Sequence, residues 1–124
     1  MTFHPARFLA SPHAQTIAAA LLRSTKGPRL RRERWDTPDG DFVDVDVLDG
    51  GPPQVLVLHG LEGSSRAGYV VECLRAAHAR GWGAYALNFR GCSGVPNQKA
   101  RSYCSGDYDD ALLVLSRMKG PRLA

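Results

Sequence analysis

The stretch Gln54-Val55-Leu56-Val57-Leu58-His59-Gly60-Leu61-Glu62-Gly63 decides the fold of this chain. Its four consecutive aliphatic residues have no polar alternation, and such a run is typical of a central strand that is covered on both faces. The turn that follows brings small and polar residues to the carboxyl end of this strand. Because α/β sheets bind ligands beyond the carboxyl ends of their strands, we expect the functional site at this turn.

A helix and a second buried strand are predicted after the turn. Residues 66–80, which Ser64 and Ser65 can cap, carry apolar side chains at helical spacing, and Gly81 ends the pattern. These apolar side chains are Val70, Val71, Leu74 and Ala77. Residues 84–89 form another apolar run, so the segment 54–89 is predicted to be a right-handed strand-helix-strand crossover.

An antiparallel hairpin is predicted before this crossover. Residues 29–35 and 42–48 are separated by the turn signal Thr37-Pro38-Asp39-Gly40. In the second strand three valines alternate with Asp44 and Asp46, which predicts one face exposed to water. Residues 49–53, rich in glycine and proline, are predicted to be a loop.

The remaining elements are a helix at each end of the chain. Residues 13–23 follow the capping pair Ser11-Pro12, and residues 108–119 follow a capping Asp107. The later helix has an apolar side formed by Ala111, Leu112, Leu115 and Met118. Residues 90–106 are a loop, and 122–124 resemble the start of another strand. The whole order predicts an α/β fold with an antiparallel edge on a mainly parallel sheet.

Composition and spacing argue against several classes of partner. The chain has 124 residues and a net charge of +4, with its positive charge concentrated in Lys26, Arg29, Arg31, Arg32 and Arg34. A solvated face is favoured there, and a surface for anionic lipid is the alternative; nucleic acid is excluded because no aromatics interleave with the cluster. We expect no cofactor, since neither G-x-G-x-x-G nor a P-loop occurs.

No metal site is expected either. The aspartates of residues 39–46 lack the spacing of an EF-hand, and the three cysteines lack a C-x-x-C pair. An odd number of unpaired cysteines is typical of a reduced, cytoplasmic protein. The apolar run 17–22 is far too short to span a bilayer.

Five motifs in order resemble one family. They are Ser11-Pro12-His13-Ala14-Gln15-Thr16, Asp39-Gly40-Asp41-Phe42, His59-Gly60-Leu61-Glu62-Gly63-Ser64-Ser65, Asn88-Phe89-Arg90-Gly91-Cys92-Ser93-Gly94 and Arg101-Ser102-Tyr103-Cys104-Ser105-Gly106-Asp107. Together they resemble the YheT-like branch of the α/β-hydrolase superfamily, which holds esterases and lipases that act on fatty acyl esters. The resemblance implies a short- or medium-chain acyl ester as the substrate of the full-length family.

The same resemblance implies a role for the turn. Val55 to Leu58 becomes the third strand of the hydrolase sheet, and the backbone N–H of Leu61 becomes one donor of an oxyanion hole. Glycines on both sides, Gly60 and Gly63, would let the backbone approach the substrate. His59 is expected to pin the turn rather than to act as a base. Arg90 is expected to anchor loop groups rather than to bind substrate.

The catalytic triad is not expected in this chain. In the family the nucleophilic serine lies in G-F-S-L-G-G-N, on the strand that would begin near Arg122, and the acid and histidine follow later. Ser93 does not fit a nucleophile elbow, and neither Cys92 nor Cys104 has a basic partner evident in sequence. We therefore expect a truncated hydrolase: an N-terminal helical segment, 1–28, and the first half of a hydrolase domain, 29–124.

Two other functions are compatible with the sequence. Truncation would leave the central strand as an open edge, so the chain could be a non-catalytic pairing module that assembles with a complementary half or with itself. A small nucleotide-binding α/β domain is the third alternative, although its fingerprint is missing.

Overall fold

The computed structural model describes residues 11–21, 26–104 and 106–123. In chain order the elements are α1 (Pro12–Leu21), β1 (Arg31–Asp36), β2 (Phe42–Leu48), β3 (Gly51–Leu58), α2 (Gly68–Ala79), β4 (Trp82–Asn88), α3 (Asp109–Arg117) and β5 (Arg122–Leu123). The expected hairpin and the expected strand-helix-strand-helix order are both confirmed. None of the described helices has the length and apolar character needed to cross a bilayer.

The strands form one mixed sheet in the order β1-β2-β4-β3-β5. β1 and β4 both run antiparallel to β2, whereas β4 and β5 run parallel to β3. This arrangement confirms an α/β fold with an antiparallel edge, and it agrees with part of an α/β-hydrolase sheet. The end of β3 and the end of β4 lie at the same edge of the sheet, because the two strands are parallel neighbours.

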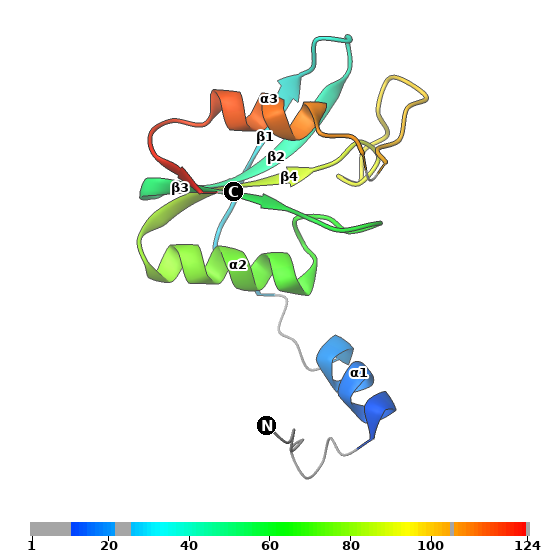
Figure 1. The fold of residues 1–124 in the computed structure, drawn as a ribbon, viewed down its shortest axis with the longest axis vertical. Helices are drawn as coiled ribbons and strands as arrows, with labels where there is room; N and C mark the ends of the chain where they lie inside the picture. Colours follow the sequence, from blue (N-terminus) through cyan, green and yellow to red (C-terminus); the bar gives the residue numbers. More distant parts are fainter. Residues whose placement is uncertain (1–10, 22–25, 105, 124) are drawn as a thin grey trace.

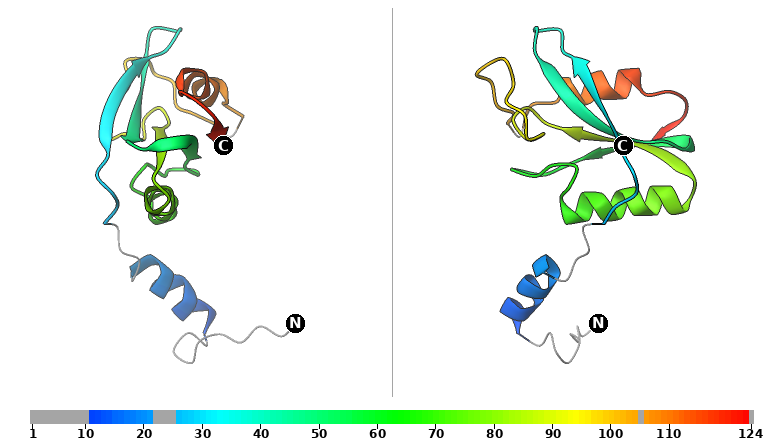
Figure 2. Two further views of the ribbon diagram at one scale, coloured as in Figure 1. Left: turned by 90° about the vertical axis from the view of Figure 1, so that its left-hand side faces the viewer. Right: turned by 180° about the vertical axis from the view of Figure 1, so that it is seen from behind.

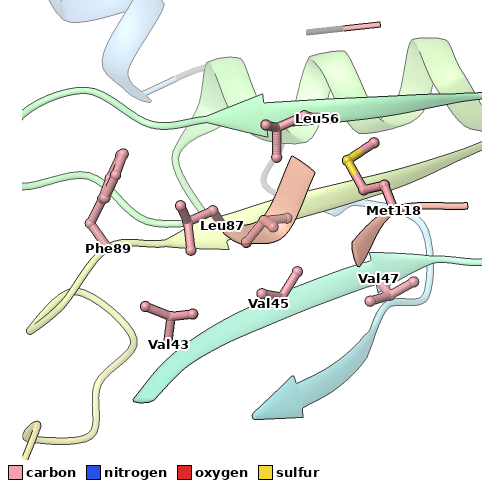
Figure 3. Close-up of a cluster of buried hydrophobic side chains, with 8 residues drawn as sticks. Val43, Val45, Val47, Leu56, Leu87, Phe89 and Met118 are labelled. Carbon is pink, nitrogen blue, oxygen red and sulfur yellow. The ribbon is translucent and has the colours of Figure 1, made fainter. Parts of the chain in front are cut away.

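The two helices that pack on the sheet cover opposite faces, α3 on one side and α2 on the other, while α1 lies apart (Figures 1 and 2). Alternate residues of each strand therefore enter two separate cores. On the α3 side the core contains Val43, Val45, Val47, Leu56, Leu87, Phe89, Val114 and Met118, most of which are labelled in Figure 3. On the α2 side it contains Leu48, Val57, Val70, Leu74, Ala77, Ala84 and Ala86.

The predicted helix boundaries hold better than the predicted caps. Ser11 Oγ accepts the N–H of Ala14 at 3.3 Å, as a capping serine does, although the predicted end at Arg23 lies outside the described residues. Neither α2 nor α3 has a side-chain cap. The hydroxyl of Ser65 donates instead to Asp46, and Asp107 pairs with Arg101. Both side chains therefore bond other side chains, Ser65 a residue of β2 and Asp107 a residue of the same loop, instead of helix-end amides.

The apolar side predicted for the last helix is shifted. Its buried residues are Asp110, Val114 and, just beyond its end, Met118, whereas Leu112 is 53% exposed. Met118 is in the core, and Ala111 and Leu115 pack against it, so the prediction is wrong at Leu112 and lacks Asp110. Asp110 is buried by an ion pair with Arg90, which moves the inward-facing side of the helix by about one position.

The prediction that one face of the hairpin is exposed to water is wrong. All seven residues of β2 are buried, including Asp44 and Asp46. Arg34 and Arg32 of β1 cover these carboxylates with ion pairs of 2.8 Å each. Burial acts to raise the pKa of both carboxyl groups, but hydrogen bonds, those from the arginines being the largest, outweigh it and hold both pKa values below the ordinary range.

The basic cluster is thereby largely neutralised within the chain, since Arg31 also pairs with Glu33 and Asp49.

The predicted loop 49–53 needs a correction as well. β3 begins at Gly51, in register with Trp82 of β4, and an irregularity between Gly51 and Gln54 accommodates the two prolines within the strand. Strand pairing has overridden the low strand propensity of proline.

The sequence predicts that β3 is covered on both faces and open along one edge, and the structure agrees in part. Leu56 and Val57 are buried, but Leu58 at the end of the strand is 43% exposed. β5 pairs with β3 through Gln54 and Val55 only. From Leu56 onward, no strand of the described part of the chain pairs with this side of β3.

Candidate functional site

The turn that follows β3, residues 59–63, lies beside a mainly apolar cavity of about 420 Å³. Leu58 to Leu61 line one side of the cavity, Phe89 at the end of β4 lines another, and residues of the loop before α3 close it, among them Tyr103 and Tyr108. The cavity therefore lies beyond the carboxyl ends of two parallel strands, where the sequence pattern places the site.

Three of the four amides at positions 60 to 63 have hydrogen-bond partners. The N–H of Gly60 donates to the hydroxyl of Tyr69 at 2.6 Å, and the N–H of Glu62 donates to the hydroxyl of Tyr103 at 2.7 Å. The N–H of Gly63 donates to the carbonyl of Gly60 at 3.0 Å. The remaining amide is that of Leu61, which has no hydrogen-bond partner among the described residues. Leu61 is also 85% exposed.

Both ring nitrogens of His59 are occupied by backbone groups. Nε2 accepts the N–H of Phe89 at 3.1 Å, so the proton resides on Nδ1, which donates to the carbonyl of Gly60 at 2.8 Å. The ring also lies edge-on to Phe89 and Tyr103, with centroids 5.1 and 5.8 Å away. The histidine thus joins the end of β3 to the end of β4. It has no free nitrogen with which to take a proton from a substrate.

The two glycines of the turn differ in what surrounds them. A Cβ on Gly63 would lie 3.0 Å from both the Gly60 carbonyl oxygen and the Tyr69 hydroxyl, whereas a Cβ on Gly60 would meet only that hydroxyl, at 3.5 Å. Gly63 is required by close packing inside the turn, which differs from the substrate approach inferred from sequence. The residue with the left-handed backbone conformation is Glu62, with φ of 53°.

Arg90, two residues after β4, is buried and pairs with three carboxylates, of which Asp41 and Asp110 are buried and Asp39 is partly exposed. We call Arg90, Asp39, Asp41 and Asp110 the Arg90 cluster. Its guanidinium meets Asp110 at 2.8 and 2.9 Å and Asp39 at 2.7 Å. These bonds raise the pKa of Arg90 and lower that of Asp39. Burial acts to raise the pKa of Asp41, but hydrogen bonds from Asn97, Gln98 and Phe42 outweigh it. Arg90 therefore anchors carboxylates, as predicted.

The structure gives no support to a nucleophile among the residues considered from sequence. The Ser93 hydroxyl contacts the backbone of Val95, at 3.4 and 3.5 Å, and its hydrogen bond also helps to lower the pKa of the Asp44 carboxyl. Burial raises the pKa of the Cys92 thiol, which disfavours the thiolate, and Cys104 is an exposed free cysteine. Among the hydrogen bonds of the described residues, none joins a serine or cysteine to a histidine. The same part of the chain holds no group of three His, Cys, Asp or Glu placed for a metal.

Sequence reasoning missed the two tyrosines that hold the turn. Tyr103 belongs to one of the five quoted motifs, and Tyr69 follows another by a few residues, yet neither was assigned a role. Their hydroxyls reach the turn from α2 and from the loop after β4, so only the tertiary fold brings them together. An aromatic hydroxyl within a glycine-rich motif was the available signal.

Comparison with known proteins supports the family indicated by the five motifs. The chain is 39% identical to YheT of Escherichia coli (strain K12), named as a candidate esterase, over 114 residues covering 88% of this chain and 34% of that protein. It is 29% identical to an abhydrolase domain-containing protein of Dictyostelium discoideum, covering 92% of this chain and 31% of the relative. It is 24% identical to the human phospholipase ABHD3, covering 92% and 30%.

The chain thus spans about a third of the length of the curated relatives it matches. No protein-family model matches the chain, and no solved structure matches it.

Proposed function

The chain is related to the YheT-like α/β hydrolases, and from this premise we propose that it supplies the oxyanion-binding side of a carboxylic-ester hydrolase site. We call residues 59–63 the oxyanion turn. In this proposal the N–H of Leu61 donates to the ester oxygen as it becomes an alkoxide, and the apolar cavity beside the turn receives the acyl chain. The ester substrate follows from relatives named as an esterase and a phospholipase.

The observation that carries the proposal is the free amide of Leu61. Its neighbours in the turn have partners, but this N–H has none among the described residues. An attacking nucleophile turns the carbonyl oxygen into an alkoxide, and a preorganised donor at that point is worth roughly 3 kcal/mol of barrier. A backbone amide that is held in place and left unpaired is what such a donor requires.

The nucleophile, the acid and the catalytic histidine are proposed to come from outside these 124 residues. His59 is committed to two backbone groups, and among the described residues no hydrogen bond joins Ser93 or Cys92 to a histidine. On this proposal the isolated chain does not turn over esters. Robust hydrolysis of p-nitrophenyl acetate or butyrate by the 124-residue chain, abolished by Ser93→Ala or Cys92→Ala, would overturn this part.

The donor role can be tested in a chimera in which this chain replaces the matching segment of the Escherichia coli relative. Leu61→Pro removes the N–H and should lower kcat for p-nitrophenyl esters by about 10²- to 10³-fold. Leu61→Ala keeps the amide and should stay within about threefold of the unmodified chimera. Circular dichroism checks that both variants are folded. Equal activity of the folded Leu61→Pro and Leu61→Ala variants would refute the oxyanion role.

A second candidate function has its own observation. From Leu56 to Leu58, one side of β3 has no strand partner in the described part of the chain, and Leu58 is 43% exposed. An unpaired strand edge can add a strand from another chain. The alternative is therefore a pairing module, which predicts concentration-dependent association in sedimentation velocity. A monomer at all concentrations that unfolds cooperatively would count against it.

A further inference from the structure

The oxyanion turn is held by two hydroxyl groups that arrive from different elements. Tyr69 lies in the first turn of α2, next to Val70, which is 1% exposed and packs in the core on that face. The packing of α2 on the sheet thus fixes the position of the Tyr69 backbone. Its hydroxyl accepts the N–H of Gly60 at 2.6 Å.

Tyr103 approaches the turn from the loop between β4 and α3. Its ring stacks on Phe89, with centroids 4.9 Å apart, and lies edge-on to His59. Its hydroxyl accepts the N–H of Glu62 at 2.7 Å and donates to the carbonyl of Gly60 at 3.3 Å. Burial raises the pKa of this hydroxyl, so it keeps the proton that it donates at neutral pH.

These contacts divide the amides of the turn into paired and free. The two hydroxyls take the N–H groups on either side of Leu61, and Gly63 pairs within the turn. Glu62 is meanwhile held in a left-handed conformation, with φ of 53°, which is unfavourable for a residue with a side chain. Such a conformation persists where surrounding contacts fix it, and the bond from Glu62 to Tyr103 is one of them.

We propose that Tyr69 and Tyr103 are positioning residues that fix the oxyanion turn from two sides and leave Leu61 as its single free donor. The proposal rests on the proposed function for its catalytic meaning, but not for its geometry. A donor stabilises a developing charge most when it is already aimed and needs no rearrangement. By bonding the flanking amides, the two hydroxyls hold the backbone in the conformation in which the Leu61 N–H has no partner among the described residues.

The geometric part is tested by amide hydrogen exchange in the ¹⁵N-labelled chain, read residue by residue at Gly60, Leu61 and Glu62. In the unmodified chain the Leu61 amide should exchange fastest of the three. Tyr69→Phe should speed the exchange of Gly60, and Tyr103→Phe that of Glu62, each by about two- to tenfold. Tyr85→Phe is the matched control, because it removes a hydroxyl from β4 that makes no hydrogen bond among the described residues.

A crossed pattern is the diagnostic result. If both variants speed both amides equally, the tyrosines only contribute general stability, and the proposal is overturned. It is overturned as well if neither amide responds, or if Leu61 is protected in the unmodified chain. Should the isolated chain give no dispersed spectrum, the same three amides are followed in the chimera by exchange and fragment mass spectrometry, with the same outcomes.

The catalytic part is read in the chimera. Each tyrosine variant should lower kcat by about two- to tenfold with KM nearly unchanged, because the turn contacts the transition state more than the ground state. A change in KM alone would assign the tyrosines to substrate binding and overturn the positioning role. If the crossed exchange pattern holds while Leu61→Pro retains full activity, the oxyanion function fails and the two-sided hold on the turn stands.

Discussion

The oxyanion turn and the Arg90 cluster occupy the same edge of the sheet but are built in opposite ways. The Arg90 cluster follows β4 and is made of paired charges that are buried, except for the partly exposed Asp39. The turn follows β3 and is held by hydrogen bonds between neutral backbone and hydroxyl groups, with the Leu61 amide left unpaired. Among the described residues no buried side-chain nitrogen or oxygen lacks a partner. A saturated cluster can only hold structure, whereas a free donor at a cavity can bind a ligand.

The largest effect that separates the two regions is expected in acid. The pKa values of Asp39 and Asp41 lie below the unfolded value of about 3.9. Their stabilising contribution is therefore complete above about pH 5 and is lost as the pH falls below about 4. Urea unfolding followed from pH 7 to pH 3 should show a steep fall in the midpoint. Asp44 and Asp46 contribute in the same direction.

The control for acid sensitivity is Arg90→Ala, which removes the hydrogen bond that is the main cause of the low pKa of Asp39. Its unfolding midpoint should vary less with pH than that of the unmodified chain. Parallel curves for the two proteins would show that the Arg90 cluster is not the source of the acid dependence, and the contrast between the regions would lose its electrostatic basis.

Arg90→Ala itself should be the most destabilising single replacement of the comparison at neutral pH. It leaves carboxylates buried without a counter-charge, which costs about 3 to 5 kcal/mol of the free energy of unfolding. Arg66→Ala is the matched control, since Arg66 is exposed and should change stability by less than about 0.5 kcal/mol. Chemical denaturation at pH 7 measures both. A loss below about 1 kcal/mol for Arg90→Ala would contradict the structural role of the cluster.

In the turn, the expected losses of stability are smaller and depend on the room available for an added Cβ. Gly63→Ala places a Cβ 3.0 Å from the Gly60 carbonyl oxygen and from the Tyr69 hydroxyl, and such crowding costs about 1 to 3 kcal/mol. Gly60→Ala, in the same turn, meets only an ordinary contact of 3.5 Å and should be tolerated within about 0.5 kcal/mol. Thermal unfolding of the two variants compares them directly. Equal tolerance would mean that the turn is loosely held.

The contrast between these regions also explains what the sequence could predict. Hydrophobic patterns depend on local spacing, so Val70, Val71, Leu74 and Ala77 were correctly placed on the buried side of α2. The role of Asp110 could not be inferred in this way, because an acidic residue is buried only when a distant partner, here Arg90, neutralises it. The same reason made Asp44 and Asp46 look exposed.

For the site, the sequence predicted the location of the turn but not the side chains that hold it. The position of the turn follows from an apolar strand and a glycine pair, which are local signals. The hydroxyls of Tyr69 and Tyr103 lie 9 and 41 residues along the chain from their partners. Those partners are backbone amides, which do not depend on the residue type. A sequence pattern cannot predict a contact of that kind, so the unpaired amide of Leu61 is recognised only in the folded structure.

The smallest expected effect concerns the side chain next to that amide. Leu61 is 85% exposed, so Leu61→Ala should change the free energy of unfolding by less than about 0.5 kcal/mol. Leu74→Ala, at a fully buried leucine of α2, should cost about 2 to 5 kcal/mol in the same denaturation assay. In the Arg90 cluster the side chain is the functional part, but at Leu61 it is the backbone. If Leu61→Ala were as costly as a core replacement, the leucine would have been kept for packing, and its unpaired amide would be a by-product of that packing rather than a donor held for a substrate.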